Sequence, residues 1–448
     1  MSIGIKVKRG LDLRLEGGVA DTSAITAKPT RTVAVIPDDF PGLVPKMDVR
    51  EGDRVASGQP LFHDKARPSI KVCSPASGLV KAVVRGERRK ILRIEVEVDG
   101  SVSTTHDTTG VFADASKAKS LLLESGLWAM MNQRPYAIVP DTEAAIRDIF
   151  ISGFDSAPLA VAPCELSDAG KEQMKAGIRL LGLLTKGKVY ISRRPCQLFP
   201  MLDGAETVTI EGPHPSGNTG TLIALTKPVN KGETVLCLDL PTLLRIGATA
   251  LTGIVPMETT VALTGSEIKE PKMVSTLIGA SIEALLDGEV KADGKHHRII
   301  SGNVLTGITT PADGYLHLPY TQVTVIPEGD DVDEFMGWAS VSPSKMSVSR
   351  SFPSWFLGKR LFNPDARLLG GRRAMIMSGE YDKVMPMDIL PEYLIKSILA
   401  RDIDRMEQLG IYEVAPEDFA LAEYADTSKL ELQKIVREGL DYLRKELE

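Results

Sequence analysis

The sequence predicts a multidomain protein of mixed α/β and α+β class, and three observations support this. Closely spaced glycine turns between residues 49 and 80 are typical of a small β barrel. Short apolar strands alternate with amphipathic helices between residues 117 and 252, as in parallel sheets covered by helices. The chain has 448 residues, whereas single cores stop growing at about 250–300 residues. We therefore expect four domains, at residues 1–105, 106–258, 259–330 and 331–448.

The first domain contains a run of tight turns between short apolar strands. Gly52-Asp53 and Gly58-Gln59 supply the positive φ that such hairpins need. Together with Cys73-Ser-Pro-Ala-Ser-Gly78, they resemble a biotinyl/lipoyl-like β barrel. Carriers of this fold present an acceptor lysine on the hairpin before that last turn, where this chain has Ala66-Arg67-Pro68. Because a guanidinium stays protonated and cannot be acylated as a lysine amine can, we expect a barrel used for assembly.

The second domain follows a polar linker at residues 100–110. Its apolar residues alternate between strand-like runs and helix-like spacing, which predicts βαβ units and a Rossmann-like parallel sheet. The expected helices are 120–128, 143–150 with Asp141 or Thr142 as its cap, 167–184 and 241–252. The expected strands are 136–139, 158–162, 188–192 and 234–239.

The pattern of the third domain predicts several strands and one short helix. These elements are expected within residues 261–271, 278–286, 299–307 and 322–326. One helix on a small mixed sheet favours a β-grasp (SLBB-like) fold. The chain then looks irregular as far as Asp388. Two amphipathic helical stripes follow, at 394–409 and 430–447, and such stripes are usually seams between helices.

Composition limits the function. A formal net charge of −6 and a pI near 5.7 argue against nucleic-acid binding, which favours a basic surface. No run reaches the ~18 apolar residues of a membrane span. Residues 1–9 alternate like a strand and lack the apolar core of a signal peptide. We expect a protein of the cytoplasm or of a membrane surface.

Cysteines and histidines give no metal motif. Cys73, Cys164, Cys196 and Cys237 are too dispersed for a metal clip or an iron-sulfur cluster, so buried structural thiols are expected. The adjacent pair His296-His297 would point to opposite faces of a strand. No group of residues has the pattern of a nucleophile, base and oxyanion hole, so we predict no catalytic residues and no metal site.

Two short motifs match cofactor loops poorly. Residues 182–189 resemble a phosphate-binding loop, but Val189 replaces the hydroxyl residue and the order is helix to strand. We interpret them as a helix C-cap at Gly187. Residues 246–249 resemble part of a covalent flavin attachment site, but Ile246 replaces its hydroxyl residue, so helix core is expected.

Residues 212–220, Gly-Pro-His-Pro-Ser-Gly-Asn-Thr-Gly, form the strongest candidate loop. The candidate binding residues are His214, Ser216, Gly217 and Gly220, because hydroxyls, an imidazole and exposed amides can hold an anion. The alternative is a rigid turn, with prolines fixing φ and with Gly217 and Gly220 left-handed. The turn is favoured because no adjoining helix start is evident.

Several blocks of the chain together resemble one family, the A subunits of the bacterial Na⁺-translocating NADH:quinone oxidoreductases. The resemblance runs almost end to end, and its most specific parts lie at 372–391 and 409–421. The blocks are 5–13, 49–80, 212–217, 304–307, 325–329, 372–375, 379–391, 409–414 and 417–421.

The resemblance implies a peripheral subunit on the cytoplasmic side of the bacterial inner membrane. Its complex passes electrons from NADH through FAD, FMN and iron-sulfur centres to quinone and exports Na⁺. Related flavoprotein subunits carry glycine-rich loops and cysteine ligands that this chain lacks. Many family members have Cys-x-x-x-Cys where this chain reads Leu421-Ala-Glu-Tyr-Ala425. We therefore expect no cofactor in this chain, with the cofactors and quinone bound through other subunits.

Three functional hypotheses remain. The first is a cofactor-free structural and regulatory component, docked on the other subunits of the complex through the barrel and the irregular segment. The second is a module that binds quinone for that complex or a component like the C subunit of the related Rnf complex. The third is a biotin or lipoyl carrier modified on Lys65 or Lys71.

Overall fold

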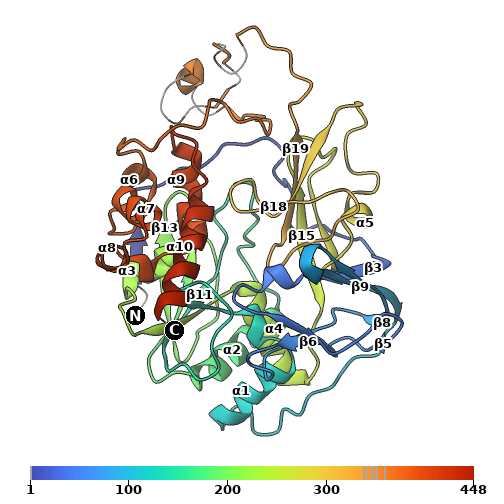
Figure 1. The fold of residues 1–448 in the computed structure, drawn as a ribbon. Helices are drawn as coiled ribbons and strands as arrows, with labels where there is room; N and C mark the ends of the chain where they lie inside the picture. Colours follow the sequence, from blue (N-terminus) through green and yellow to red (C-terminus); the bar gives the residue numbers. More distant parts are fainter. Residues whose placement is uncertain are drawn as a thin grey trace.

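The computed structural model describes residues 3–336, 339, 341–343, 345–346, 348, 352–357 and 360–447 (Figure 1). Several sheets and a group of helices pack against one another, which confirms the mixed α/β multidomain class. Among the described residues, no helix combines the length and the apolar character needed to cross a membrane.

Two open sheets form the first part of the chain. Their orders are β3-β9-β8-β5 and β4-β6-β7, and they share a core that includes Leu61, Phe62, Val80 and Ile94. Gly52 and Gly58 have φ values of 89° and 81°, as the turn prediction requires. The strands are β3 (Thr32–Val35), β4 (Pro45–Met47), β5 (Arg54–Val55), β6 (Pro60–Asp64), β7 (Lys71–Cys73), β8 (Ser77–Arg85) and β9 (Ile91–Gly100).

The predicted closed barrel is corrected to a sandwich of these two sheets. Strands β4, β5 and β7 are only two or three residues long. Such short strands do not supply the continuous ladder that closing a sheet requires. The described strands therefore leave both sheets open.

The N-terminal segment contributes strands to two other sheets. β1 (Ile3–Lys6) pairs in parallel with β13 of the second domain, and β2 (Ile25–Ala27) pairs in parallel with β16 of the third. The strand expected at the N-terminus is confirmed, but its partners lie about two hundred residues away or more. The segment thus ties the domains together through backbone hydrogen bonds.

The second domain is a six-stranded sheet of order β1-β13-β12-β11-β14-β10, parallel except for β10. Strand residues alternate between two cores. Ile149 and Ile151 pack with α2 and α4, and Phe150 packs on the other face with α3. The elements are α1 (Ala115–Glu124), β10 (Asn132–Arg134), β11 (Ile146–Ser152), α2 (Asp168–Gly182), β12 (Val189–Arg193), β13 (Ala205–Glu211), α3 (Thr219–Thr226), β14 (Thr234–Asp239) and α4 (Leu240–Thr252).

Helices α2 and α4 approach closely because glycines face each other. A Cβ on Gly247 would lie 1.7 Å from the carbonyl oxygen of Gln173 in α2. A Cβ on Gly177 would lie 2.7 Å from a side-chain atom of Leu243 in α4. The helices 167–184 and 241–252 and the strands 188–192 and 234–239 are confirmed, apart from small shifts at their ends.

Three predicted elements of this domain are wrong. The predicted helix 143–150 is largely the central strand β11, because burial on both faces outweighs its helix-favouring Glu and Ala residues. Residues 136–139 form a turn after β10, in which Tyr136 and Ala137 have φ values of 79° and 48°. Residues 158–162 are loop, and strand β13 was not anticipated.

The third part is a mixed sheet of order β18-β17-β19-β15-β16-β2, covered by one short helix. β15 pairs antiparallel with β16 and parallel with β19, so the predicted mixed sheet with one helix is confirmed. The elements are β15 (Glu258–Thr264), β16 (Lys272–Leu277), α5 (Ile282–Leu286), β17 (His297–Ser301), β18 (Ile308–Thr309) and β19 (Gln322–Pro327).

The C-terminal part is helical. Its core includes Leu394, Ile398, Leu440 and Leu443, which confirms the expected seam between helices. The helices are α6 (Tyr381–Val384), α7 (Pro391–Ala400), α8 (Ile403–Gln408), α9 (Ala420–Ala425) and α10 (Leu432–Leu447), with a 3₁₀ turn at Pro416–Phe419.

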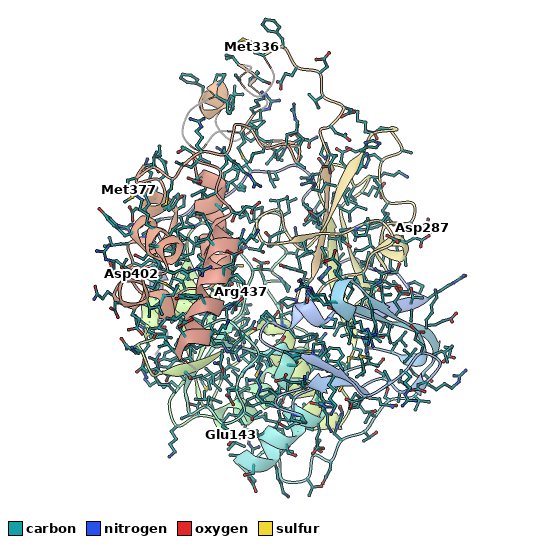
Figure 2. All side chains as sticks on the ribbon, in the orientation of Figure 1. Glu143, Asp287, Met336, Met377, Asp402 and Arg437 are labelled. Atoms are coloured by element: carbon teal, nitrogen blue, oxygen red, sulfur yellow. The ribbon has the colours of Figure 1, made fainter. Side chains whose placement is uncertain are left out.

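The segment predicted to be irregular lies between these helices and the mixed sheet. Residues 337, 338, 340, 344, 347, 349–351, 358 and 359 of that prediction lie outside the described residues. The described remainder, up to residue 388, holds a short 3₁₀ helix at Pro353–Leu357 and the four-residue helix α6 at Tyr381–Val384. The prediction of irregular chain is therefore wrong at α6. Figure 2 shows Met336 at the end of the molecule opposite Glu143.

Candidate functional site

The carboxyl ends of the parallel strands form the edge at which such folds bind ligands. The chain runs from β11 to β12 and β13 on one side and then returns to β14 on the other side of β11. The strand order therefore reverses between β11 and β14, and ligands of open α/β sheets bind at such reversal points. The loop 212–220 follows β13 at the same edge.

His214 lies buried in this loop. Its Nδ1 is 3.0 Å from Ser156 Oγ, and its backbone N–H donates to Asp12 Oδ1 at 2.9 Å. Its Nε2 is buried and has no hydrogen-bond partner among the described residues. Burial lowers the pKa of His214 to about 4, so the imidazole is neutral at pH 7. His214 therefore acts here as a buried, neutral part of the loop.

The other candidate residues serve close packing. Ser216 Oγ donates to the carbonyl oxygen of Gly212, and the backbone N–H of Gly217 donates to Ser156 Oγ at 2.8 Å. A Cβ on Gly217 would lie 2.7 Å from the backbone nitrogen of Ser156. The predicted left-handed conformation of Gly217 and Gly220 is wrong, since positive φ in this loop occurs at Gly212. The later glycines are required by close neighbours and not by φ: Gly217 faces the backbone of Ser156, and Gly220 faces the carboxylate of Asp418.

A helix does begin at this loop, contrary to expectation. Helix α3 starts at Thr219, and the carboxylate of Asp418 lies over its first turn. A Cβ on Gly220 would be 2.3 Å from Asp418 Oδ1. The chain's own carboxylate thus lies against the first turn of α3, although its Oδ1 accepts no hydrogen bond from the described residues.

Arg134 holds that carboxylate in place. Arg134 Nη1 donates to Asp418 Oδ2 at 2.9 Å, and Nη2 donates to Glu417 Oε1 at 2.7 Å. The Arg134 side chain is 2% exposed. Burial opposes its charge, but Asp418 and Glu417 outweigh burial and raise the pKa of Arg134 further. Sequence reasoning missed this pair because its members are 284 residues apart and belong to no motif.

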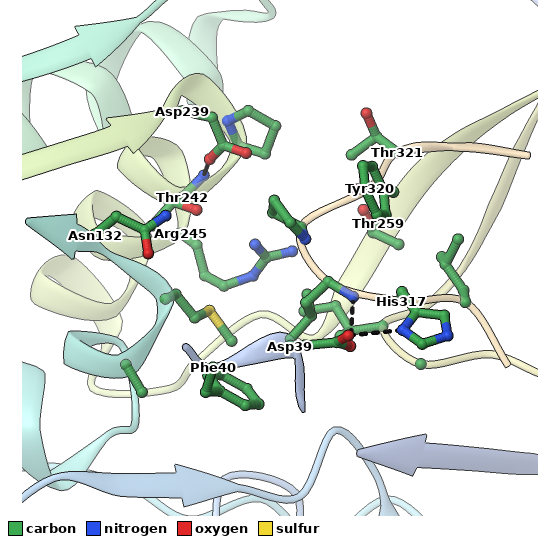
Figure 3. Close-up of a pocket in the computed structure, with 18 residues that line it drawn as sticks. Asp39, Phe40, Asn132, Asp239, Thr242, Arg245, Thr259, His317, Tyr320 and Thr321 are labelled. Atoms are coloured by element: carbon green, nitrogen blue, oxygen red, sulfur yellow. Dashed lines mark hydrogen bonds and ion pairs between the residues drawn. The ribbon is translucent and has the colours of Figure 1, made fainter. Parts of the chain in front are cut away.

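A small cavity lies where the first three domains meet (Figure 3). Asp39 Oδ1 lies 2.6 Å from His317 Nδ1, and Asp39 Oδ2 accepts from the backbone N–H of Leu318 at 2.9 Å. Burial raises the pKa of Asp39. Arg245 enters from α4 and donates to the carbonyl oxygen of Pro256. The cavity measures about 50 Å³, which is room for a few waters and well below the ~300 Å³ of typical ligand pockets.

The two weaker motifs lie away from this edge or inside the core. Helix α2 ends at Gly182, so the predicted C-cap at Gly187 is wrong. Gly187 instead lies against the backbone of Arg147: a Cβ on Gly187 would be 2.0 Å from the Arg147 carbonyl oxygen, so only glycine fits there. The predicted helix-to-strand order of residues 182–189 is confirmed. Ile246 and Thr249 are fully buried in α4, as predicted for residues 246–249.

The cysteine prediction is half right. Cys237 is buried and Cys73 is partly buried, but Cys164 and Cys196 are exposed. Their sulfur atoms lie 2.7 Å apart. Cys164 and Cys196 both lie in segments to which no helix or strand was assigned, just after the predicted strands 158–162 and 188–192, so the sequence offered no sign of their proximity.

Within the described part of the chain, Glu267, Asp293 and His297 are a group of metal-ligand residue types, with ligand atoms within 4.8 Å of one another. His297 Nε2 is 3.0 Å from Asp293 Oδ1 and 3.8 Å from Glu267 Oε2. These contacts between the three side chains explain why they lie close together. The neighbouring His296 pairs with Asp330, at 2.7 Å.

Arg67, at the position of a carrier lysine, is folded back on its own hairpin. Its Nε donates to Asp64 Oδ2 at 2.7 Å, and its side chain is 17% exposed. Asp64 is almost fully buried. The arrangement is that of a fixed ion pair rather than a swinging arm.

Family models match most of the chain. Residues 5–99 match the NqrA N-terminal barrel-sandwich hybrid domain, residues 113–255 the NqrA second alpha/beta domain, and residues 260–311 the NQRA C-terminal domain. Among solved structures, a chain of an NAD⁺-reducing [NiFe]-hydrogenase aligns with 12% sequence identity and a TM-score of 0.36. The alignment covers 75% of this chain and 61% of the hydrogenase chain.

Curated relatives match from end to end. The A subunit of the Na(+)-translocating NADH-quinone reductase of Vibrio anguillarum is 36% identical over 99% of this chain and 100% of its own. The equivalent protein of Rhodopirellula baltica is 36% identical over 98% of each chain. That of Neisseria meningitidis serogroup B is 34% identical over 99% of this chain and 100% of its own. This chain therefore belongs to the NqrA family, the A subunits of the Na⁺-translocating NADH-quinone reductases.

Proposed function

We propose that this chain is the peripheral A subunit of a sodium-translocating NADH:quinone reductase, on the cytoplasmic side of the membrane. In that complex, electron transfer from NADH to quinone is coupled to Na⁺ transport out of the cell. The chain holds no redox cofactor of its own and serves to dock and regulate. FAD, FMN, iron-sulfur centres, NADH and quinone are bound through the other subunits, which are its partners.

The observation that carries the cofactor-free part of this proposal is the buried carboxylate at the start of α3. Asp418 lies against the first turn of α3, and a helix start is a place that favours an anion such as a phosphate. The buried Arg134 neutralises the Asp418 carboxylate. Removing one member of this pair would leave the other charge buried without its principal partner, at a cost of about 3–5 kcal/mol. A phosphate would therefore have to displace a carboxylate that the fold already holds.

Docking would use the segment that follows the mixed sheet. Phe335 and Val341 are 89% and 80% exposed, and Met336 is 66% exposed. Exposed apolar side chains that are adjacent, as Phe335 and Met336 are, favour a surface that a partner covers. Membrane subunits of the same complex are the partners that the family supplies.

The test is to purify the full chain and the complex lacking it. We expect no stoichiometric flavin or iron-sulfur absorbance from the chain alone, and recovery of Na⁺-dependent quinone reduction when the chain is added back. A stoichiometric chromophore in the chain would overturn its cofactor-free role. Unchanged activity in the complex without the chain would overturn its assignment to that complex.

Binding of quinone by this chain is the second candidate. It is favoured by the position of the three-domain cavity beside β14, but the cavity of about 50 Å³ is small for a quinone ring. Titration of the chain with a soluble quinone distinguishes the two, because saturable binding would support the second candidate. A carrier role is tested by intact mass, which we expect to show no acyl addition on Lys65 or Lys71.

A further inference from the structure

Cys164 and Cys196 lie on neighbouring loops at the carboxyl edge of the parallel sheet. Cys164 lies in the loop between β11 and α2, and Cys196 lies in the loop after β12. Because β11 and β12 are adjacent parallel strands, their following loops meet at the same edge. Both thiols are exposed, and the sulfurs are 2.7 Å apart, closer than the about 3.5 Å of ordinary non-bonded contacts.

The two loops are joined by hydrogen bonds that do not involve sulfur. The backbone N–H of Leu198 donates to the carbonyl oxygen of Cys164 at 2.8 Å. The buried amide of Gln197 donates to the carbonyl oxygens of Gly153 and Pro163, at 3.0 and 3.3 Å. The backbone therefore brings the two thiols together before any bond forms between them, and such positioning greatly raises effective concentration.

The direction of the contact between the sulfurs gives the two thiols different roles. Cys164 donates its thiol hydrogen to Cys196 Sγ, and this hydrogen bond raises the pKa of Cys164. A thiolate is the nucleophile in disulfide exchange. Because the Cys164 hydrogen is held in this contact, Cys196 is the sulfur placed to attack first. By contrast, burial raises the pKa of Cys73 and of Cys237 to about 12, so those thiols stay protonated.

We propose that Cys164 and Cys196 are a reversible disulfide site whose co-reactant is a small disulfide such as oxidised glutathione. The thiolate of Cys196 attacks one glutathione sulfur, and the other glutathione leaves as a thiolate. Cys164 then loses its proton, and its sulfur attacks Cys196 and releases the second glutathione. One protein disulfide and two reduced glutathiones result, so the electrons and protons balance.

The disulfide between Cys164 and Cys196 would restrain the edge of the sheet at which the loop 212–220 lies. Arg194, two residues before Cys196, donates to the carbonyl oxygen of Asp155 at 3.1 Å. Its guanidinium also lies 5.1 Å from the centroid of the Phe154 ring. Asp155 precedes Ser156, which contacts His214. Oxidation would therefore restrain the segment on which the buried imidazole depends.

The experiment treats the purified full chain with oxidised glutathione and measures intact mass. We expect the wild type to lose two hydrogens and to retain no glutathione. A non-reducing digest should then join the peptides of Cys164 and Cys196, and dithiothreitol should reverse the change. The closed loop should raise the melting temperature by about a few degrees.

Three variants provide the controls. Cys73→Ser should behave as the wild type, whereas Cys164→Ser and Cys196→Ser should each retain one glutathione and show no rise in melting temperature. Two outcomes would overturn the proposal. In one, the wild type keeps two glutathiones. In the other, it keeps both thiols free under conditions that modify the single variants.

Discussion

At the scale of single residues, the buried pair of Arg134 and Asp418 dominates the candidate site. Both side chains are 2% exposed, and each is the other's principal counter-charge. A pair of this kind costs desolvation when it forms, so its net contribution to stability is small. The loss of one partner is severe, however, because the remaining charge stays buried.

Asp418→Ala should therefore lower the free energy of unfolding by about 3 kcal/mol, measured by urea denaturation. This is the lower end of the range for a broken buried pair, because Glu417 Oε1 still pairs with Arg134 at 2.7 Å. The matched control is Asp38→Ala, which removes an exposed ion pair with Lys90 at 2.7 Å, both side chains being 58% exposed. Exposed pairs contribute about 0–1 kcal/mol. Equal effects of the two substitutions would contradict the buried character of the Arg134 pair.

Gly220→Ala tests the space at the start of α3. Its new Cβ would lie within 2.5 Å of both Asp418 oxygens, so the carboxylate or the helix must shift. We expect a loss of about 1–3 kcal/mol in unfolding free energy, as for other overpacked cores. Gly182→Ala at the end of α2 is the control, because nothing lies within 4 Å of its Cβ position, and we expect no loss there.

His214 should make stability depend on pH. Its pKa is about 4 in the folded chain and 6.5 ordinarily, so the unfolded chain binds more protons between these values. Stability is therefore unaffected above pH 6.5 and falls as pH drops from 6.5 towards 4. The loss from this residue should be about 2 kcal/mol at pH 5 relative to pH 7.

The measurement is the difference in pH dependence between the wild type and His214→Asn, which keeps a polar group near Ser156. Unfolding free energies at pH 5 and pH 7 should differ less in the variant, by about 2 kcal/mol. The same difference in both proteins would show that His214 is already protonated or accessible when folded.

At the scale of elements, the shared strands decide how the domains are held together. β1 completes the parallel sheet at its outer side, beyond β13, and the Val7 N–H donates to the carbonyl oxygen of Glu211 at 2.8 Å. Val7 itself is 4% exposed. Strand pairing over such a sequence distance makes the first residues part of the second domain's core.

Removal of residues 1–7 should expose the edge of β13. We expect faster hydrogen exchange at the amides of residues 208–211, which pair with β1, and unchanged exchange at residues 149–151 in the central strand β11. Slow exchange at residues 208–211 after truncation would mean that β1 contributes little to the sheet.

At the scale of the whole molecule, the exposed segment after β19 is the place to test docking. Phe335→Ser combined with Val341→Ser removes apolar surface that packs little on the chain itself, since both side chains are at least 80% exposed. The isolated chain should keep its stability within about 0.5 kcal/mol.

The same double variant should bind the other subunits of its complex about ten-fold or more weakly, as measured by co-purification from membranes, if these side chains are central to the interface. Met201→Ser is the control, because Met201 is 87% exposed and lies in the second domain. Equal retention of all three proteins in the complex would place the docking surface elsewhere.

Much of the fold could be predicted from local patterns. Gly52 and Gly58 indicated their turns, the helices α2, α4 and α10 followed from their apolar stripes, and the mixed sheet followed from its strands and its single helix. These signals are local, because helix periodicity and turn conformation depend on residues a few positions apart.

The errors share a different physical cause. Residues 143–150 contain good helix formers, but they lie between two layers of helices and pair with strands on both sides, so burial and pairing outweigh propensity. The absence of a helix start at residue 219 was misjudged for a related reason, since α3 is apolar and buried and shows no amphipathic pattern.

The sequence by itself determined the family, the class of fold, the missing carrier lysine and the location of the candidate loop, because these depend on residue identity and short-range order. Only the tertiary structure decided what fills that loop. The contacts of Arg134 with Asp418, of Ser156 with His214 and of Cys164 with Cys196 join residues 284, 58 and 32 positions apart. Such contacts depend on how sheet edges and helices pack, and no local pattern of residues encodes them.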